Sequence, residues 1–201
     1  MQRQCLPKFP VIPIMHIPVG YTDPVAPFCD KDTIPIREIP YMWSFVGDSY
    51  KPDRQRVLGA FQDIKSSFLH EHKGFLGEDK LSAEGYWESL TKSVFCPCPI
   101  GNVSIESYRT FEGLEAGAIP LIIKHQARQP YNYYKLLLGD HPISAFENWE
   151  QARVFVEESN MDQIVSLAQQ INEWYQQYKI KIQKDIQSIL LSSFHVTSQS
   201  E

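Results

Sequence analysis

The spacing of the hydrophobic residues changes at Tyr41. From this residue onward, short apolar runs alternate with stretches in which apolar residues recur every three or four positions. The short runs have the length of buried strands, and the three-to-four spacing is that of one face of a helix. This alternation is typical of β-α-β units around a parallel sheet. It predicts an α/β fold over residues 41–160, with a Rossmann-like parallel sheet flanked by helices.

The same pattern gives the order of the predicted elements. Strands are expected at residues 41–47, 67–73, 94–98 and 119–123. Helices are expected at residues 52–64, 82–93, 104–117, 148–159 and 161–193. Pro52 suits the first turn of its helix, because a proline there loses no intrahelical hydrogen bond.

Two further segments flank this predicted domain. Eight of the 14 prolines lie in residues 1–40, which leaves little room for a helix. The apolar residues of this segment predict a leader or interdomain crossover that lies along a surface. Residues 161–201 are predicted to form a long C-terminal helix and tail. One stripe of this helix is apolar, which is typical of a core-facing or docking surface.

Composition narrows the class of protein. Hydrophobic residues make up 43% of the chain and charged residues 21%, which is typical of a globular domain. The net charge of -5 gives no electrostatic reason to expect nucleic acid or an anionic membrane surface as a partner. No apolar run approaches the roughly 20 residues that span a bilayer, so no membrane segment is expected in this chain.

Cysteine spacing and short motifs argue against other classes of site. The four cysteines have neither the paired spacing of a zinc site nor the density of a disulfide scaffold. The "HEH" at residues 70–72 lacks a helix and a third ligand, so no metal site is predicted. No G-x-G-x-x-G follows a predicted strand and no P-loop occurs, which disfavours dinucleotide redox chemistry. The glycosylation sequon at Asn102 falls in the loop predicted to be functional and favours a cytoplasmic chain.

The strongest candidate chemistry lies where the predicted strand at residues 94–98 ends. Gly101 permits a tight turn there, Asn102 lies in the same turn, and Ser104 is placed to cap the following helix. Amide groups at such a helix start point outward from the carboxyl end of the strand and form an anion site. Arg109, about one turn further along, adds a bidentate contact for a phosphate.

Acidic residues follow on the same predicted helix. Glu112 and Glu115 stand on neighbouring turns and are suited to accept hydrogen bonds from ribose hydroxyls. Glu106, in the predicted first turn, suits the helix dipole but repels a phosphate nearby. The alternative interpretation is a solvated helix with ordinary ion pairs, and the spacing fits it equally well.

The residues around this joint resemble a known family. The string "Y...L.KS.F" from Tyr86 to Phe95, followed by "CP...G......YR..E.LEAG.IP", is similar to the donor-binding half of the exostosin family, glycosyltransferase family 47. Upstream, "FVGD", "RQRVL" and "HIPVGY" resemble weaker elements of the same pattern. The likeness covers most of residues 16–180, and only its central block is specific. Within the family, "ESYR" is closer to the branch that contains a ribitol-linked xylosyltransferase.

The resemblance implies roles for several residues. Arg109 is implied to bind the diphosphate of a nucleotide sugar, with a UDP-sugar as the expected substrate, and Glu112 to recognise the nucleoside. Arg54 or Arg56 is implied to reach the phosphates. No cofactor and no metal are implied. The heparan-polymerising members of this family carry extra basic residues where this chain has "NVSIE", so the implied donor contacts are fewer here.

The resemblance also implies a GT-B arrangement, the C-terminal domain of which this chain represents. In that arrangement an acceptor domain comes first, a donor domain second, and the reaction takes place between them. The last helix crosses back to the first domain, so Trp174, Tyr175 and Tyr178 are expected to expose apolar surface. A missing N-terminal acceptor domain is therefore an expected partner.

The expected function is transfer of a sugar from a nucleotide-sugar donor to a glycan or other hydroxyl acceptor. The alternative is a truncated or partner-dependent module of the same fold without catalysis. The catalytic base is not identified, because Asp48, His70, His72 and His125 lie at strand or loop ends where such residues are more often structural. As part of a longer membrane-anchored chain, the domain is expected in the Golgi lumen instead of the cytoplasm.

Overall fold

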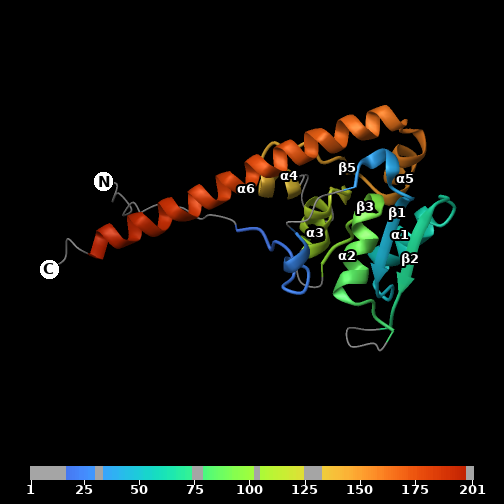
Figure 1. Cartoon of the computed structure of the whole chain (residues 1–201), viewed down its shortest axis with the longest axis horizontal. Helices are drawn as coiled ribbons and strands as arrows, with labels where there is room; N and C mark the ends of the chain where they lie inside the picture. Colours follow the sequence, from blue (N-terminus) through green and yellow to red (C-terminus); the bar gives the residue numbers. More distant parts are fainter. Residues whose placement is uncertain (1–16, 30–33, 74–78, 102–104, 125–132, 198–201) are drawn as a thin grey trace, which may run out of the picture.

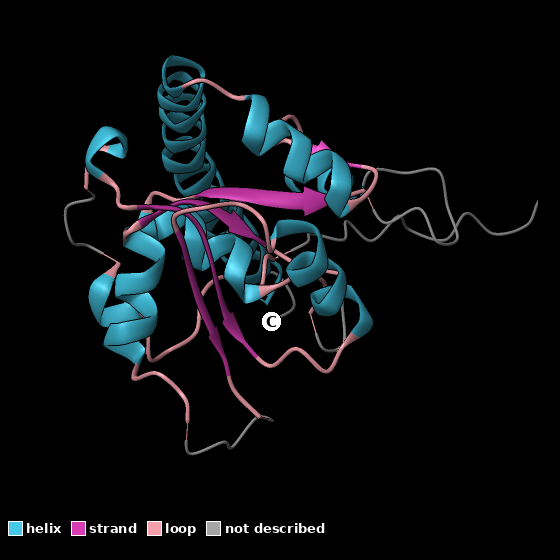
Figure 2. Cartoon of the chain, turned by 90° about the vertical axis from the view of Figure 1, so that its right-hand side faces the viewer, coloured by secondary structure: helices cyan, strands magenta, loops and turns pink. Residues whose placement is uncertain are grey.

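The fold is a five-stranded parallel sheet with helices on both faces (Figures 1 and 2). A computed structural model describes residues 17–29, 34–73, 79–101, 105–124 and 133–197. The strands are β1 (Tyr41–Gly47), β2 (Ser67–Glu71), β3 (Ser93–Pro97), β4 (Ile119–Ile123) and β5 (Ala145–Phe146). Their spatial order is β2-β1-β3-β4-β5, and every neighbouring pair is parallel. The predicted Rossmann-like α/β fold is therefore confirmed.

Helices connect and cover these strands. They are α1 (Pro52–Phe61), α2 (Ala83–Thr91), α3 (Tyr108–Ala116), α4 (Tyr133–Leu138), α5 (Trp149–Glu158) and α6 (Met161–Thr197). Phe95 of β3 packs edge-on against Phe155 of α5, with ring centroids 6.0 Å apart. The next residue, Cys96, lies against Gly113 of α3. Because successive strand residues point to opposite faces, α5 covers one face of the sheet and α3 the other.

Each face has its own packing partners. On the α5 side, α1 packs against α5, and an aromatic chain joins Trp43, Phe61 and Trp149 at centroid distances of 5.2 and 6.5 Å. On the α3 side, α2 packs against α3 and both contact β3. The central strands β3 and β4 are buried along their whole length, as the unbroken apolar runs predict.

The described part of the leader contains two short 3-10 helices, η1 (Ala26–Phe28) and η2 (Ile36–Glu38). Residues 17–29 lie beside α3, and η2 contacts α6. Val25 is buried in the domain core, at 1% exposure. The leader is thus held against the helical layer by both backbone hydrogen bonds and a core side chain.

Helix α6 has two unlike parts. Its first turns pack on α3, β4 and η2, and they bury Ile164, Ile171, Tyr175 and Tyr178. The expectation that Tyr175 and Tyr178 are exposed was therefore wrong, since only 4% and 8% of their surface is accessible, and Trp174 is half-buried. The apolar stripe up to this point is core-facing. Further along, α6 extends away from the sheet (Figure 1) and exposes apolar side chains: Ile189, Leu190 and Leu191.

Several element boundaries differ from the sequence prediction. Helix α3 begins at Tyr108 with Ser107 as its N-cap, four residues later than expected, so Ser104 is not the cap of this helix. Strand β2 ends at Glu71. The six-residue α4 and the two-residue β5 were not predicted, because elements this short show no periodicity. None of the described helices is both long and apolar enough to cross a bilayer.

We expect the two parts of α6 to respond differently to truncation of one side chain. Ile164→Ala removes a side chain that is 2% exposed, so it should lower the free energy of unfolding by about 2–4 kcal/mol. Leu190→Ala, at a position 53% exposed on the same helix, should change it by less than about 0.5 kcal/mol. Urea denaturation of both variants measures the difference. Equal losses would mean that the distal turns are also packed.

Candidate functional site

The strand order reverses between β1 and β3. Starting from β1, the chain first moves outward to β2 and then returns across β1 to β3 and onward to β4. In open α/β sheets, ligands bind outside the carboxyl ends of the strands at such a reversal, because the two connecting loops part there. In this chain the carboxyl ends are Gly47 of β1 and Pro97 of β3. We call the loops after these residues the switch point.

Arg109 of α3 reaches the end of β1. Its Nη2 donates a hydrogen bond to the carbonyl oxygen of Val46, and its guanidinium carbon lies 4.4 Å from the centroid of the Phe45 ring. Its Nη1 is buried and has no hydrogen-bond partner among the described residues. A buried guanidinium nitrogen without an acceptor is costly, because the water it loses is not replaced by another acceptor.

Gly47 makes room for this arginine. Its φ of +153° is a conformation that favours glycine, and a Cβ added there would lie 3.1 Å from Arg109 Nη2. The sequence "FVGD" therefore ends a strand with the one residue type that fits beneath the guanidinium. The absence of a side chain at Gly47 thus lets Arg109, in the first turn of α3, lie against the backbone of β1.

Other positive groups at the switch point already have partners. Arg54 Nη1 forms an ion pair with Asp48 Oδ1 at 2.6 Å and donates to the Asp48 carbonyl at 3.1 Å. Lys51 Nζ donates to the carbonyl of Gly101 at 3.4 Å. The structure thus brings the predicted residues Arg54, Gly101 and Arg109 to the loops after β1 and β3. Asn102 and Ser104 lie outside the described residues.

Asp53 organises the loop after β3, and sequence reasoning missed it. Its Oδ2 accepts a hydrogen bond from the Ile100 amide at 3.0 Å, and its Oδ1 accepts one from Trp149 Nε1 at 2.9 Å. The carboxylate is buried, so these donors replace the water that it loses. One side chain in the first turn of α1 therefore fixes the chain before Gly101 and the start of α5. An acidic residue directly after Pro52 is an ordinary helix start, and nothing in the sequence marks it as buried.

Glu112 lies inside the domain, between α2 and the leader. Its Oε2 accepts a hydrogen bond from Tyr86 Oη at 2.6 Å, and its Oε1 accepts bonds from Thr22 Oγ1 at 2.8 Å and the Thr22 amide at 3.3 Å. Burial holds the pKa of Tyr86 well above its usual value, opposed by the charge of Arg109 and assisted by that of Glu112, so Tyr86 remains a donor. Recognition of a nucleoside by Glu112 remains a prediction, and any nucleoside would share this carboxylate with Thr22.

Glu106 and Glu115 lie at opposite ends of α3. Glu106 precedes the helix, is 5% exposed, and accepts a hydrogen bond from the Val19 amide at 3.0 Å. Glu115 is in the last turn and accepts bonds from Tyr175 Oη at 2.9 Å and Lys179 Nζ at 3.0 Å. Glu115 therefore turns toward α6, and α3 carries two separate polar sites at its two ends.

The described residues considered as a catalytic base are Asp48, which follows β1, and His70 and His72 at the end of β2. Asp48 is held by Arg54, and His70 Nε2 lies 2.6 Å from the carbonyl oxygen of Asp79 at an exposed edge of the sheet. The backbone amide of His72 donates to the Gly47 carbonyl at 3.2 Å. His125 lies outside the described residues. Within the described part of the chain, no group of three or more His, Cys, Asp or Glu side chains is arranged to hold a metal ion.

Comparison with known proteins gives one family. The family described as RXYLT1 C-terminal domain matches residues 27–195, a range that includes the switch point, all five strands and most of α6. This family is xylosyltransferase-related and exostosin-like. A comparison with curated proteins found no match.

We expect substitution of Gly47 to disturb the switch point. Gly47→Ala introduces an unfavourable φ and a close contact with Arg109, so it should lower the free energy of unfolding by about 1–3 kcal/mol. Gly59 is the matched control, because it is exposed within α1 and a Cβ added there would meet no atom within 4 Å. Gly59→Ala should raise the stability by about 0.5–1 kcal/mol. Urea titrations that show the same sign for both variants would contradict this account.

Proposed function

The chain belongs to the RXYLT1 C-terminal domain family, and from this premise we propose that it is the donor-binding domain of an exostosin-like glycosyltransferase. In this proposal the domain binds a nucleotide sugar, and the sugar passes to a hydroxyl group of a glycan or other acceptor. The observation that carries the proposal is Arg109, whose buried Nη1 has no partner among the described residues and lies at the switch point.

The proposed ligand of Arg109 is the diphosphate of the donor. Glycosyl transfer leaves a nucleoside diphosphate, so negative charge grows on the diphosphate as the bond to the sugar breaks. A guanidinium fixed by Val46 and Phe45 needs little reorganisation to stabilise that charge. Lys51 and Arg54 lie at the start of the neighbouring helix α1, and Arg54 would exchange part of its contact with Asp48 for phosphate oxygens. Positive side chains thus supply the charge in this proposal, and no metal is invoked.

The proposed ligand of Glu112 is the nucleoside of the donor. This nucleoside is expected to be the uridine of a UDP-sugar. A carboxylate offers about four acceptor positions, and Tyr86 and Thr22 occupy three of those of Glu112. One position remains for a ribose hydroxyl, and displacement of Thr22 would free two more. The site for the reacting end of the acceptor is proposed to lie on a second domain that faces the switch point, as in a GT-B arrangement. The catalytic base is proposed to belong to the same second domain.

A second candidate is a module of the same fold that does not catalyse transfer. Two observations favour it: Glu112 is already engaged by the leader, and Arg54 is already paired with Asp48. Such a module would keep Arg109 as a packing residue of β1 and would not bind a nucleotide. Nucleotide titration separates the two candidates.

The first test is calorimetric titration of the chain with uridine diphosphate. Arg109→Ala should weaken binding by about 2–3 kcal/mol, or about thirtyfold to more than a hundredfold, and Arg109→Lys should weaken it less, because charge is kept and the bidentate geometry is lost. Arg153→Ala, on the exposed side of α5, should leave the affinity unchanged. Absence of binding by the parent chain would favour the non-catalytic module. Unchanged affinity in Arg109→Ala would end the assignment of the diphosphate site.

The second test compares two glutamates of α3. Glu112→Gln places an amide nitrogen against the donors Tyr86 and Thr22, so it should lower the free energy of unfolding by about 1–3 kcal/mol and change the ranking among uridine, guanosine and adenosine diphosphates. Glu115→Gln should leave that ranking as it is, since Glu115 faces α6. Thermal melts and titrations of both variants decide which carboxylate recognises the nucleoside.

A further inference from the structure

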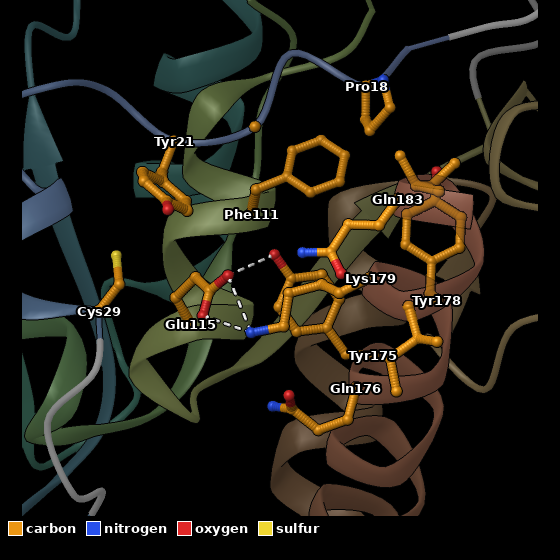
Figure 3. A pocket seen from close by; sticks show the side chains of 13 residues that line it. Pro18, Tyr21, Cys29, Phe111, Glu115, Tyr175, Gln176, Tyr178, Lys179 and Gln183 are labelled. Atoms are coloured by element: carbon orange, nitrogen blue, oxygen red, sulfur yellow. Dashed lines mark hydrogen bonds and ion pairs between the residues drawn. The ribbon is translucent and has the colours of Figure 1, made fainter. Parts of the chain in front are cut away.

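A groove runs between the leader and α6, with the last turn of α3 as its floor. It consists of two adjoining cavities of about 470 and 690 Å³, which share Glu115, Gln176 and Lys179 as lining residues. Each volume lies in the range of roughly 300–1,000 Å³ that is usual for small-molecule sites. Figure 3 shows the first cavity, with Pro18 and Tyr21 of the leader on one side and α6 on the other. The groove faces away from Arg109, because its lining residue Phe111 follows Arg109 by two residues and so lies about 200° around α3, and Glu115 lies about 9 Å further along the helix axis than Arg109.

The wall that α6 contributes combines apolar side chains, such as Val165, Ala168, Ile180 and Ile182, with a stripe of amide side chains. Residues separated by three and four positions lie on one face of a helix. The stripe that faces the groove at this spacing consists of Gln169, Asn172, Gln176, Lys179 and Gln183. Lys179 is half-buried and the four amides are exposed. These amides are exposed polar positions at the edge of the groove, so their donors and acceptors are open to a ligand.

Aromatic side chains line the first cavity beside the amides. Tyr21 is 39% exposed, and Phe111, Tyr175 and Tyr178 form the inner wall. The faces of aromatic rings carry negative potential and attract polarised C–H groups, which sugar rings present on one side. The hydroxyl of Tyr178 is buried without a hydrogen-bond partner among the described residues. Amides and hydroxyls both donate and accept hydrogen bonds, as sugar hydroxyls require.

The charges in the groove cancel. Glu115 pairs with Lys179 at 3.0 Å, and the second cavity adds one cation, Arg37, and one anion, Glu38. The lining therefore gives neither an anionic nor a cationic ligand a net electrostatic advantage. A neutral ligand rich in hydroxyl groups fits these walls best, and two joined cavities fit a chain of more than one unit.

We propose that this groove is a binding site for a neutral oligosaccharide. Glycan binding follows from the groove alone, whereas the identification of that glycan with the acceptor of the transfer reaction rests on the proposed function. The sugar units in the groove would be remote from the reacting hydroxyl, so the groove would select and hold a longer acceptor chain. A peptide is the competing occupant, and the test below includes it.

The experiment presents the whole chain to an array of neutral, sialylated and sulfated oligosaccharides, followed by calorimetric titration of the best neutral binder. Gln176 contributes to both cavities and is exposed, so Gln176→Ala should weaken glycan binding about fivefold to tenfold without changing the melting temperature. Gln170→Ala is the matched control, because Gln170 is exposed on the same helix outside the stripe. It should leave binding unchanged.

A second variant tests the inner wall. Tyr178→Phe removes the hydroxyl that has no partner among the described residues, so it should leave the melting temperature unchanged or raise it while it weakens glycan binding severalfold. Arg109→Ala separates the two sites, because it should weaken nucleotide binding about thirtyfold to more than a hundredfold and leave glycan binding intact. If the parent chain binds the glycan but no nucleotide, the proposed function is refuted and the glycan site is not.

Three results would overturn the glycan site. These are an array without neutral binders, binding that requires sulfate or sialic acid, and neutral binding that survives both Gln176→Ala and Tyr178→Phe. A random peptide library tests the competing occupant. Peptides that bind the parent chain but not Gln176→Ala, in the absence of any neutral glycan binding, would assign the groove to a peptide instead.

Discussion

A buried carboxylate needs hydrogen-bond donors in place of water, and this requirement fixes the irregular parts of the chain. Asp53 takes its donors from the loop after β3 and from Trp149 at the start of α5. Glu106 and Glu112 take theirs from Val19 and Thr22 of the leader. Sheet hydrogen bonds and apolar packing stabilise the strands and helices without these groups. The position of the leader and of the switch-point loop depends on the three carboxylates.

Helix α3 connects the two proposed sites. Its first turn directs Arg109 toward the carboxyl ends of the strands, and its last turn directs Glu115 toward α6. Between them Glu112 ties the helix to α2 and the leader. Gly113 allows the same helix to lie close to Cys96 of β3, where an added Cβ would be 3.4 Å from the cysteine Cβ. The helix is therefore held on three sides, and its polar ends are placed with little freedom.

The leader belongs to both sites. Its backbone occupies an oxygen of Glu112, the carboxylate proposed to meet the nucleoside, and its Pro18 and Tyr21 line the groove proposed to hold a glycan. Movement of residues 17–29 would change both sites together. A nucleotide sugar that competes with Thr22 for Glu112 would in this way change the shape of one wall of the groove. This competition gives a physical route for coupling between binding of the nucleotide sugar and binding of the acceptor.

The sequence by itself determined the parallel sheet, because its central strands are buried on both faces and appear as unbroken apolar runs such as residues 119–123. It also determined that Gly101 follows the end of a strand and that Arg109 lies in the next helix, since the strand, turn and helix are consecutive in the chain. The contact of Arg109 with Val46 of β1 was decided by the tertiary structure. Only the tertiary structure decided where Glu112 and Glu115 point, because their partners Thr22, Tyr86, Tyr175 and Lys179 come from distant segments. The same holds for Tyr175 and Tyr178, whose apolar stripe fits a core or an interface equally well. A helical period fixes which residues share a face, and only the packed neighbours decide what that face meets.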